Sequence, residues 1–334
     1  MKPDLYIFYE EPENDRWVAG DRHPRRLFRI VRDKIFRREA PVGGMKKWFI
    51  NLVKGLDILG AAYKINDYKA LAKSKNGIAL VIGKPHVVEK IPDHIRIIYG
   101  PALASHPTDN TFWERKKIVH LMISCHWLQE LYQRDLPVKI PSSVWPSGVE
   151  TDEWLPDTAQ SRPATVLVYD KIRWDRDKLE PGLLNPIVQD LEKRGLTVTY
   201  LKYGAYEEAE YREVLDKVCG MVFLCEHETQ GFAYLQALSC NVPILAWDRG
   251  GEWSDPAYYP HKVKFGPVTS VPYWDNSCGE KFKDMDEFRE AAALFLSSIE
   301  KNSYRPRDYI LENFRLEQRA QEYLDIIAQV NTCG

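Results

Sequence analysis

Apolar residues along most of the chain fall into short continuous runs separated by longer stretches in which they recur with the period of a helix. The short runs have the length of buried strands and are found at residues 5–9, 77–82, 95–99, 119–124, 165–169, 196–201, 221–224 and 243–247. The helix-spaced stretches include residues 45–59, 127–132, 206–218 and 232–240. Strands that alternate with helices predict parallel sheets covered by helices on both faces.

The alternation is interrupted once, between residues 139 and 163. This segment is polar, contains no long periodic run, and is punctuated by Pro141, Pro146, Pro156 and Pro163. Domain boundaries usually lie in such segments. We therefore predict an α/β fold with two doubly wound domains in series, an N-terminal one at 1–158 and a second one at 159–310.

Residues 220–251, GMVFLCEHETQGFAYLQALSCNVPILAWDRGG, read as a strand, an acidic turn, a helix, a proline and a second buried strand. A helix that begins just after a strand end presents unpaired N–H groups and a positive dipole end, which suit an anion. Glu228 on the turn needs a different partner, because a charge between a buried strand and a helix is costly unless it is used. Glu226 is expected to be a solvated neighbour.

Composition fits a folded protein. With 334 residues, of which 44% are hydrophobic and 28% charged, the chain is long enough for two domains with separate cores and is not disordered. The six cysteines are dispersed without metal-ligand spacing, which is typical of a reduced, cytoplasmic protein. There is no signal-peptide pattern at the N-terminus and no apolar run near the roughly 20 residues that span a bilayer. We therefore expect a soluble protein or one bound peripherally at the inner face of a membrane.

Charge is distributed unevenly around the net value of −2. Residues 1–160 hold 25 Lys and Arg against 20 Asp and Glu, which leaves 21 against 28 for the remainder. Eight of the basic side chains lie in residues 22–38, where apolar residues form a helical stripe. A basic amphipathic helix can lie on an anionic membrane or hold an anionic acceptor, although a solvated helix face explains the same pattern.

Several common motifs are missing from the sequence. No G-x-G-x-x-G follows either first strand, which argues against a nicotinamide dehydrogenase, and there is no P-loop. The eight histidines form no H-E-x-x-H or other metal-ligand spacing, so we expect no metal and no other cofactor.

A resemblance to one family rests on residues 228–243, ETQGFAYLQALSCNVP, which are similar to the E-x7-E segment of the retaining GT-B glycosyltransferases of the family 4 type. Other landmarks follow in the order of that family. They are the paired glycines of 41–44, the segments 124–131 and 145–152 that leave the first domain, and the sequence YILENFRLEQRAQEYL at 309–324.

The resemblance implies a GT-B fold, in which two Rossmann-like domains face a cleft and a C-terminal helix, at 311–334, returns to the N-terminal domain. It implies a hexosyltransferase that moves a sugar from a UDP-, GDP- or ADP-linked donor to a glycan or glycolipid acceptor, with retention of the anomeric configuration. Nucleic acid is not an expected partner. Two alternatives stay open. One is a nucleotide-sugar 2-epimerase on the same fold, and the other is a non-catalytic nucleotide-sugar-binding module.

The resemblance also implies roles for individual residues. Glu228 would lie beside the sugar ring and stabilise positive charge there, and His106 would face the donor sugar unless it is an ordinary loop histidine that caps or packs. Arg173 and Lys178 would bind the donor phosphates. Lys171 and Arg176 are the alternative candidates for this role.

Further implied contacts lie on either side of the donor. The N–H groups of Phe232 and Ala233 at the helix start would bind phosphate, and Gly43 and Gly44 would form the donor and acceptor loop. The ribose position carries Gln236 instead of the second Glu of the family. An amide oxygen accepts hydrogen bonds without charge assistance, so nucleotide binding would be weakened and not abolished.

Overall fold

The structure, a computed structural model, describes residues 5–11, 43–74, 77–157 and 162–332. The basic run at 22–38, with its predicted membrane contact, and the expected domain boundary at 158/159 lie outside these residues. In the described part of the chain, no helix is both long and apolar enough to cross a membrane.

The first lobe is built on a parallel sheet of six strands in the order β2-β1-β3-β4-β5-β6. The strands are β1 (Leu5–Phe8), β2 (Tyr63–Ile65), β3 (Ile78–Val81), β4 (Arg96–Tyr99), β5 (Ile118–Ile123) and β6 (Ser142–Val144). The helical segments are α2 (Gly44–Ile58), α3 (Tyr68–Lys73), α4 (Pro85–Lys90), η1 (Pro107–Asp109) and α5 (His126–Asp135). Strands β2 and β6 were not predicted, because both are short edge strands without a buried apolar run.

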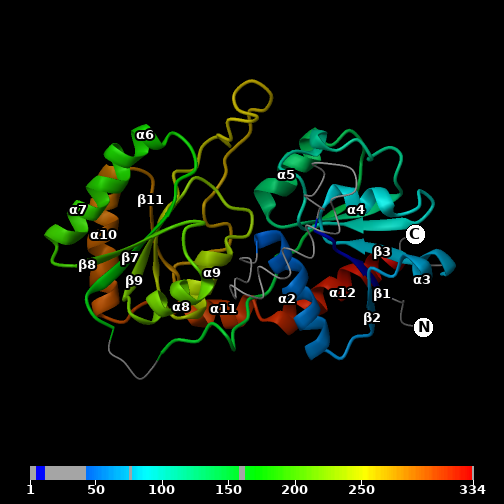
Figure 1. Cartoon of the computed structure of the whole chain (residues 1–334). Coiled ribbons are helices and arrows are strands. Elements are labelled where there is room, and N and C mark those ends of the chain that lie inside the picture. Colours follow the sequence, from blue (N-terminus) through cyan, green and yellow to red (C-terminus); the bar gives the residue numbers. More distant parts are fainter. Residues whose placement is uncertain (1–4, 12–42, 75–76, 158–161, 333–334) are drawn as a thin grey trace, which may run out of the picture.

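The second lobe has a parallel sheet of five strands in the order β11-β10-β9-β7-β8 (Figure 1). The strands are β7 (Thr165–Lys171), β8 (Thr197–Lys202), β9 (Gly220–Cys225), β10 (Ile244–Trp247) and β11 (Gly279–Phe282). The helical segments are α6 (Arg176–Leu179), η2 (Glu180–Leu184), α7 (Asn185–Lys193), α8 (Glu208–Asp216), α9 (Phe232–Ser239) and α10 (Met285–Glu300). Each sheet has a separate apolar core on either face, so the predicted pair of doubly wound domains is confirmed.

The C-terminal segment crosses from the second lobe to the first, as Figure 1 shows. The resemblance implies a single C-terminal helix at 311–334, whereas the structure has two, α11 (Pro306–Asn313) and α12 (Leu316–Thr332). Between them the Phe314 carbonyl accepts a hydrogen bond from Val149 N at 2.7 Å, so the backbone pairs with the inter-lobe connection instead of continuing the helix. Helix α12 packs so closely on α2 that a Cβ at Gly55 would lie 2.4 Å from the Leu316 carbonyl oxygen.

The loop after β10 makes a second connection between the lobes. Four residues of this loop are buried in an apolar cluster whose other fully buried members belong to the first lobe; they are Trp253, Val263, Phe265 and Val268. Arg134 on α5 donates a hydrogen bond to the Lys264 carbonyl at 2.7 Å. The loop thus anchors the second lobe on the first, directly beside the opening between them.

Candidate active site

A cleft of about 970 Å³ lies between the lobes and is lined by residues from both. Its walls are formed mainly where strands end, by Ser124 after β5, by Lys171 and Arg173 at the end of β7, and by His227 and Glu228 after β9. Ligands of open α/β sheets bind at the carboxyl ends of the strands. The cleft is therefore the candidate active site.

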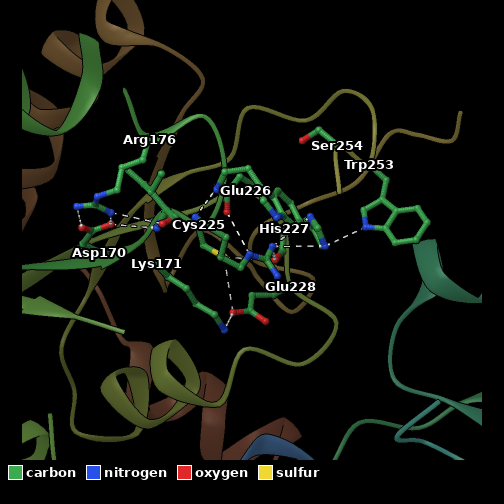
Figure 2. A network of polar contacts seen from close by, with 12 residues as sticks. Asp170, Lys171, Arg176, Cys225, Glu226, His227, Glu228, Trp253 and Ser254 are labelled. Carbon is green, nitrogen blue, oxygen red and sulfur yellow. Dashed lines mark hydrogen bonds and ion pairs between the residues drawn. The ribbon is translucent and has the colours of Figure 1, made fainter. Parts of the chain in front are cut away.

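Glu228 is held in this cleft by contacts to both lobes. Its carboxylate accepts a hydrogen bond from Lys171 Nζ (Figure 2), and its side chain is only 11% exposed. Its backbone N–H donates to the Thr269 carbonyl at 2.9 Å, and its carbonyl accepts from Trp127 Nε1 of the first lobe at 2.8 Å. Burial alone would lower the pKa of Lys171, but the Glu228 carboxylate raises it above its usual range. Lys171 is therefore protonated in the folded protein.

Glu226 is buried, and the expectation that it is a solvated neighbour is wrong. Its carboxylate accepts hydrogen bonds from the backbone N–H groups of Arg173 at 2.8 Å and Trp174 at 3.0 Å, and from Arg173 Nε at 3.2 Å. Arg173 Nη2 donates to the His227 carbonyl at 2.9 Å. Glu226 thus fixes both the turn after β7 and the Arg173 side chain that lines the cleft.

His227 is a neutral histidine in an aromatic surrounding. Burial, with the nearby cations of Arg173, Lys171 and Arg249, lowers its pKa well below the usual value. Its Nε2 accepts a hydrogen bond from Trp253 Nε1 at 3.2 Å, and its ring stacks on Trp174 with 5.3 Å between centroids. No motif distinguishes this residue from the acidic residues on either side, so no role was predicted for it.

We expect His227 to make folding stability depend on pH. Below pH about 6.5 the unfolded chain protonates this histidine and the folded chain does not, so stability falls as the pH is lowered towards the depressed folded pKa. The contribution is about 1.4 kcal/mol per pH unit in that window. Urea unfolding of the wild type between pH 7.5 and 5 should show a steeper loss than unfolding of His227→Gln. The exposed His261→Gln serves as the control, and equal slopes in wild type and His227→Gln would contradict the assignment.

The first turn of α9 faces the same cleft. Gly231 at its N-cap has φ of 72°, and the cleft is lined by Phe232 and Ala233 directly after it. The first N–H groups of a helix have no partner within the helix, so they are available to an anion. Gly43 and Gly44, at the start of α2 in the first lobe, also line the cleft. The structure thus brings these four residues together at one cleft.

Lys178 lies on α6, exposed to solvent and outside the cleft. The chain turns away after Trp174, because Asp175 has a left-handed φ of 49° and starts α6 in another direction. Arg176 is directed to Asp170, with 2.6 Å between Nη2 and Oδ2, and away from Glu228 (Figure 2). Of the four cationic candidates for binding phosphate, Lys171 and Arg173 line the cleft, and Arg176 and Lys178 do not.

His106 is buried behind the cleft wall, which differs from the expected position facing a donor sugar. Its Nδ1 lies 2.7 Å from Thr108 Oγ1, and its Nε2 lies 2.8 Å from Asp135 Oδ2 at the end of α5. Its ring stacks on Trp253 of the second lobe. The side chain is therefore engaged by its neighbours as a packed loop histidine.

Gln236 lies beside two residues that sequence reasoning missed. With its amide oxygen turned towards the nearby donors, that oxygen accepts hydrogen bonds from Lys47 Nζ at 2.6 Å and Trp154 Nε1 at 3.2 Å. Lys47 on α2 also contacts both carboxylate oxygens of Glu208 on α8, at 2.9 and 3.0 Å. No sequence signal marks Lys47 or Glu208, because charged residues on helices normally face solvent.

Among the residues that the structure describes, no group of three or more His, Cys, Asp or Glu side chains is placed to hold a metal ion.

No protein-family model matches the chain. A segment of 113 residues, 34% of this chain, is 27% identical to a protein named Probable sucrose-phosphate synthase from Thermosipho melanesiensis. The match covers 23% of that relative's length.

Solved structures are similar to the chain over its whole length. The lipopolysaccharide outer core galactosyltransferase WaaB, in its apo form, aligns with 98% of this chain and 99% of its own, with a TM-score of 0.56 at 10% identity. A sucrose-phosphate synthase from Thermosynechococcus elongatus aligns with 99% of this chain and 100% of its own, with a TM-score of 0.57 at 12% identity. The chain has the GT-B fold, as expected from the resemblance.

Proposed function

We propose that the protein is a glycosyltransferase that moves a sugar from a nucleoside-diphosphate sugar to a carbohydrate or lipid-linked acceptor, with retention of the anomeric configuration. The observation that carries the proposal is the buried pair of Glu228 and Lys171, which lies in the inter-lobe cleft beside Arg173 and the first turn of α9. The similarity of the fold to a galactosyltransferase and a sucrose-phosphate synthase supports it.

Cations and N–H groups in the cleft match the diphosphate of such a donor. Lys171 and Arg173 supply positive charge, and the N–H groups of Phe232 and Ala233 supply hydrogen-bond donors. Negative charge on the phosphate grows as the glycosidic bond breaks, so donors fixed in advance stabilise the transition state more than the ground state. Glu226 keeps the Arg173 side chain in place for this task.

Glu228 has the charge needed to stabilise the sugar of the donor during the reaction. When the bond between C1 and the phosphate oxygen breaks, its electrons go to the phosphate and the sugar becomes positively charged. A carboxylate beside the ring stabilises that charge. The acceptor hydroxyl then attacks C1 from the side of the departing phosphate, which takes the hydroxyl proton, and the products are the glycosylated acceptor and a nucleoside diphosphate.

Nucleotide binding is the first test. Thermal unfolding should be followed with UDP, GDP and ADP, and with their sugar derivatives. We expect the derivatives of one base to raise the melting temperature, because a ligand at a hundred times its Kd stabilises the native state by about 2.7 kcal/mol. The corresponding nucleoside, which lacks the diphosphate, is the control and should stabilise far less.

Turnover then separates the alternatives. The donor that binds should be incubated alone and with a panel of sugar and glycolipid acceptors, and the products analysed for linkage and anomeric configuration. A new glycoside supports the proposal. Conversion of the donor alone into its epimer would assign a 2-epimerase instead, and binding without any turnover would assign a binding module. Absence of nucleotide binding would contradict all three.

A further inference from the structure

Lys47, Glu208 and Gln236 form a charged cluster in the cleft that joins the two lobes. Lys47 comes from α2 of the first lobe, and its side chain is only 8% exposed. Its Nζ contacts both carboxylate oxygens of Glu208 on α8 and, with the amide oriented as above, the amide oxygen of Gln236 on α9. All three residues line the cleft.

The amide oxygen of Gln236 has no capacity left for a ligand. An amide oxygen has two lone pairs, and here one accepts from Lys47 Nζ at 2.6 Å and the other from Trp154 Nε1 at 3.2 Å. Only the N–H groups of the Gln236 amide remain for a bound molecule, and these can donate hydrogen bonds but cannot accept them. A ligand hydroxyl that must donate a hydrogen bond at this position therefore needs a different acceptor.

Glu208 provides that acceptor. Its carboxylate contacts the same nitrogen as the Gln236 oxygen, so the two groups are adjacent. The Glu208 side chain is 52% exposed and lines the cleft, and a carboxylate has about four lone-pair sites, of which Lys47 occupies two. Lys47 holds the carboxylate in one position through both of its oxygens. Hydrogen bonds to a carboxylate are stronger than those to a neutral acceptor.

We propose that Glu208, positioned by Lys47, is the residue that binds the ribose hydroxyls of the donor nucleotide and makes the site specific for ribonucleotides. Two adjacent hydroxyls can donate to the two oxygens of one carboxylate, a geometry that a single amide oxygen cannot offer. The inference rests on the proposed function. Because Lys47 belongs to the first lobe, this ribose site is complete only when the lobes lie together as they do in the structure.

The test compares Glu208→Gln with Glu207→Gln, the matched control. Glu207 is the neighbouring carboxylate, and it is exposed at the same cleft. Binding of the preferred nucleoside diphosphate and of its 2′-deoxy form should be measured by calorimetry for wild type and both variants. We expect wild type and Glu207→Gln to bind the ribonucleotide about tenfold more tightly than the deoxy form, as one charge-assisted hydrogen bond implies.

In Glu208→Gln, affinity for the ribonucleotide should fall about tenfold and the preference over the deoxy form should nearly vanish. An equal loss of affinity for both nucleotides would overturn the inference, because it would show that the Lys47–Glu208 pair acts only by holding the lobes together. An unchanged preference in this variant would overturn it as well. Wild-type protein that binds no nucleoside diphosphate would overturn the proposed function, whereas binding with either of the first two results overturns the inference alone.

Discussion

Replacing Glu228 with glutamine is expected to lower sugar transfer by at least about a hundredfold while the protein still folds and binds nucleoside diphosphate. Glutamine has the same shape and can still accept a hydrogen bond from Lys171, but it carries no charge to stabilise a positive sugar ring. The phosphate-binding groups are unchanged, so nucleotide affinity should stay within a few-fold of wild type. Steady-state rates with the donor and acceptor, together with calorimetric binding, measure the two effects separately.

Loss of Glu228 also removes the charged partner of the buried Lys171, so stability has to be followed in the same variant. Thermal melting with and without nucleotide shows whether the fold survives. Glu252→Gln is the control, because Glu252 is an exposed carboxylate of the same lobe that lies outside the cleft. Transfer at the wild-type rate in a folded Glu228→Gln variant would refute the assigned role.

Arg173→Gln is expected to weaken binding of the nucleoside diphosphate about ten- to a hundredfold and to reduce kcat/KM by at least as much. The guanidinium supplies charge-assisted hydrogen bonds to phosphate that glutamine lacks. Calorimetry should show the loss with the nucleoside diphosphate itself, before any sugar is involved. Glu228→Gln, by contrast, should affect chiefly kcat.

Lys178→Gln is the matched control for Arg173, because the resemblance names both residues and the structure brings only Arg173 into the cleft. We expect Lys178→Gln to bind and turn over like wild type. A large loss in Lys178→Gln with normal Arg173→Gln would show that the donor phosphates lie elsewhere. Melting temperatures are needed here too, since Glu226 remains buried in Arg173→Gln with only its two backbone donors.

Buried strands were the most predictable elements of the fold. Strands β1, β3 and β9 are continuous runs of residues buried on both faces, as is the apolar part of β7 at 166–169, and such runs can be recognised in the sequence. The short edge strand β2 and the break between α11 and α12 were missed. Both depend on pairing with distant backbone, β2 on β1 and the break on Val149, which leaves no local pattern.

The candidate site was predictable to the extent that its residues lie on one turn. Glu228, Phe232 and Ala233 follow a buried strand within a few residues, so the sequence alone places them at a strand end and a helix start. The cations that lie near these residues could not be predicted in the same way. The chain direction after β7 decides it, and the left-handed turn at Asp175 sends Lys178 to the surface while Lys171 and Arg173 remain in the cleft.

The sequence by itself determined the two α/β domains, the acidic turn that carries Glu228 and the unusual glutamine at position 236, because strand length, helix period and turn residues are local properties. Only the tertiary structure decided the partners. It buried Glu226 against Arg173, enclosed His106 beside Asp135, and brought Lys47 from the first lobe to Glu208 and Gln236 of the second. These contacts join residues far apart in the chain, and their geometry depends on how the two lobes pack together.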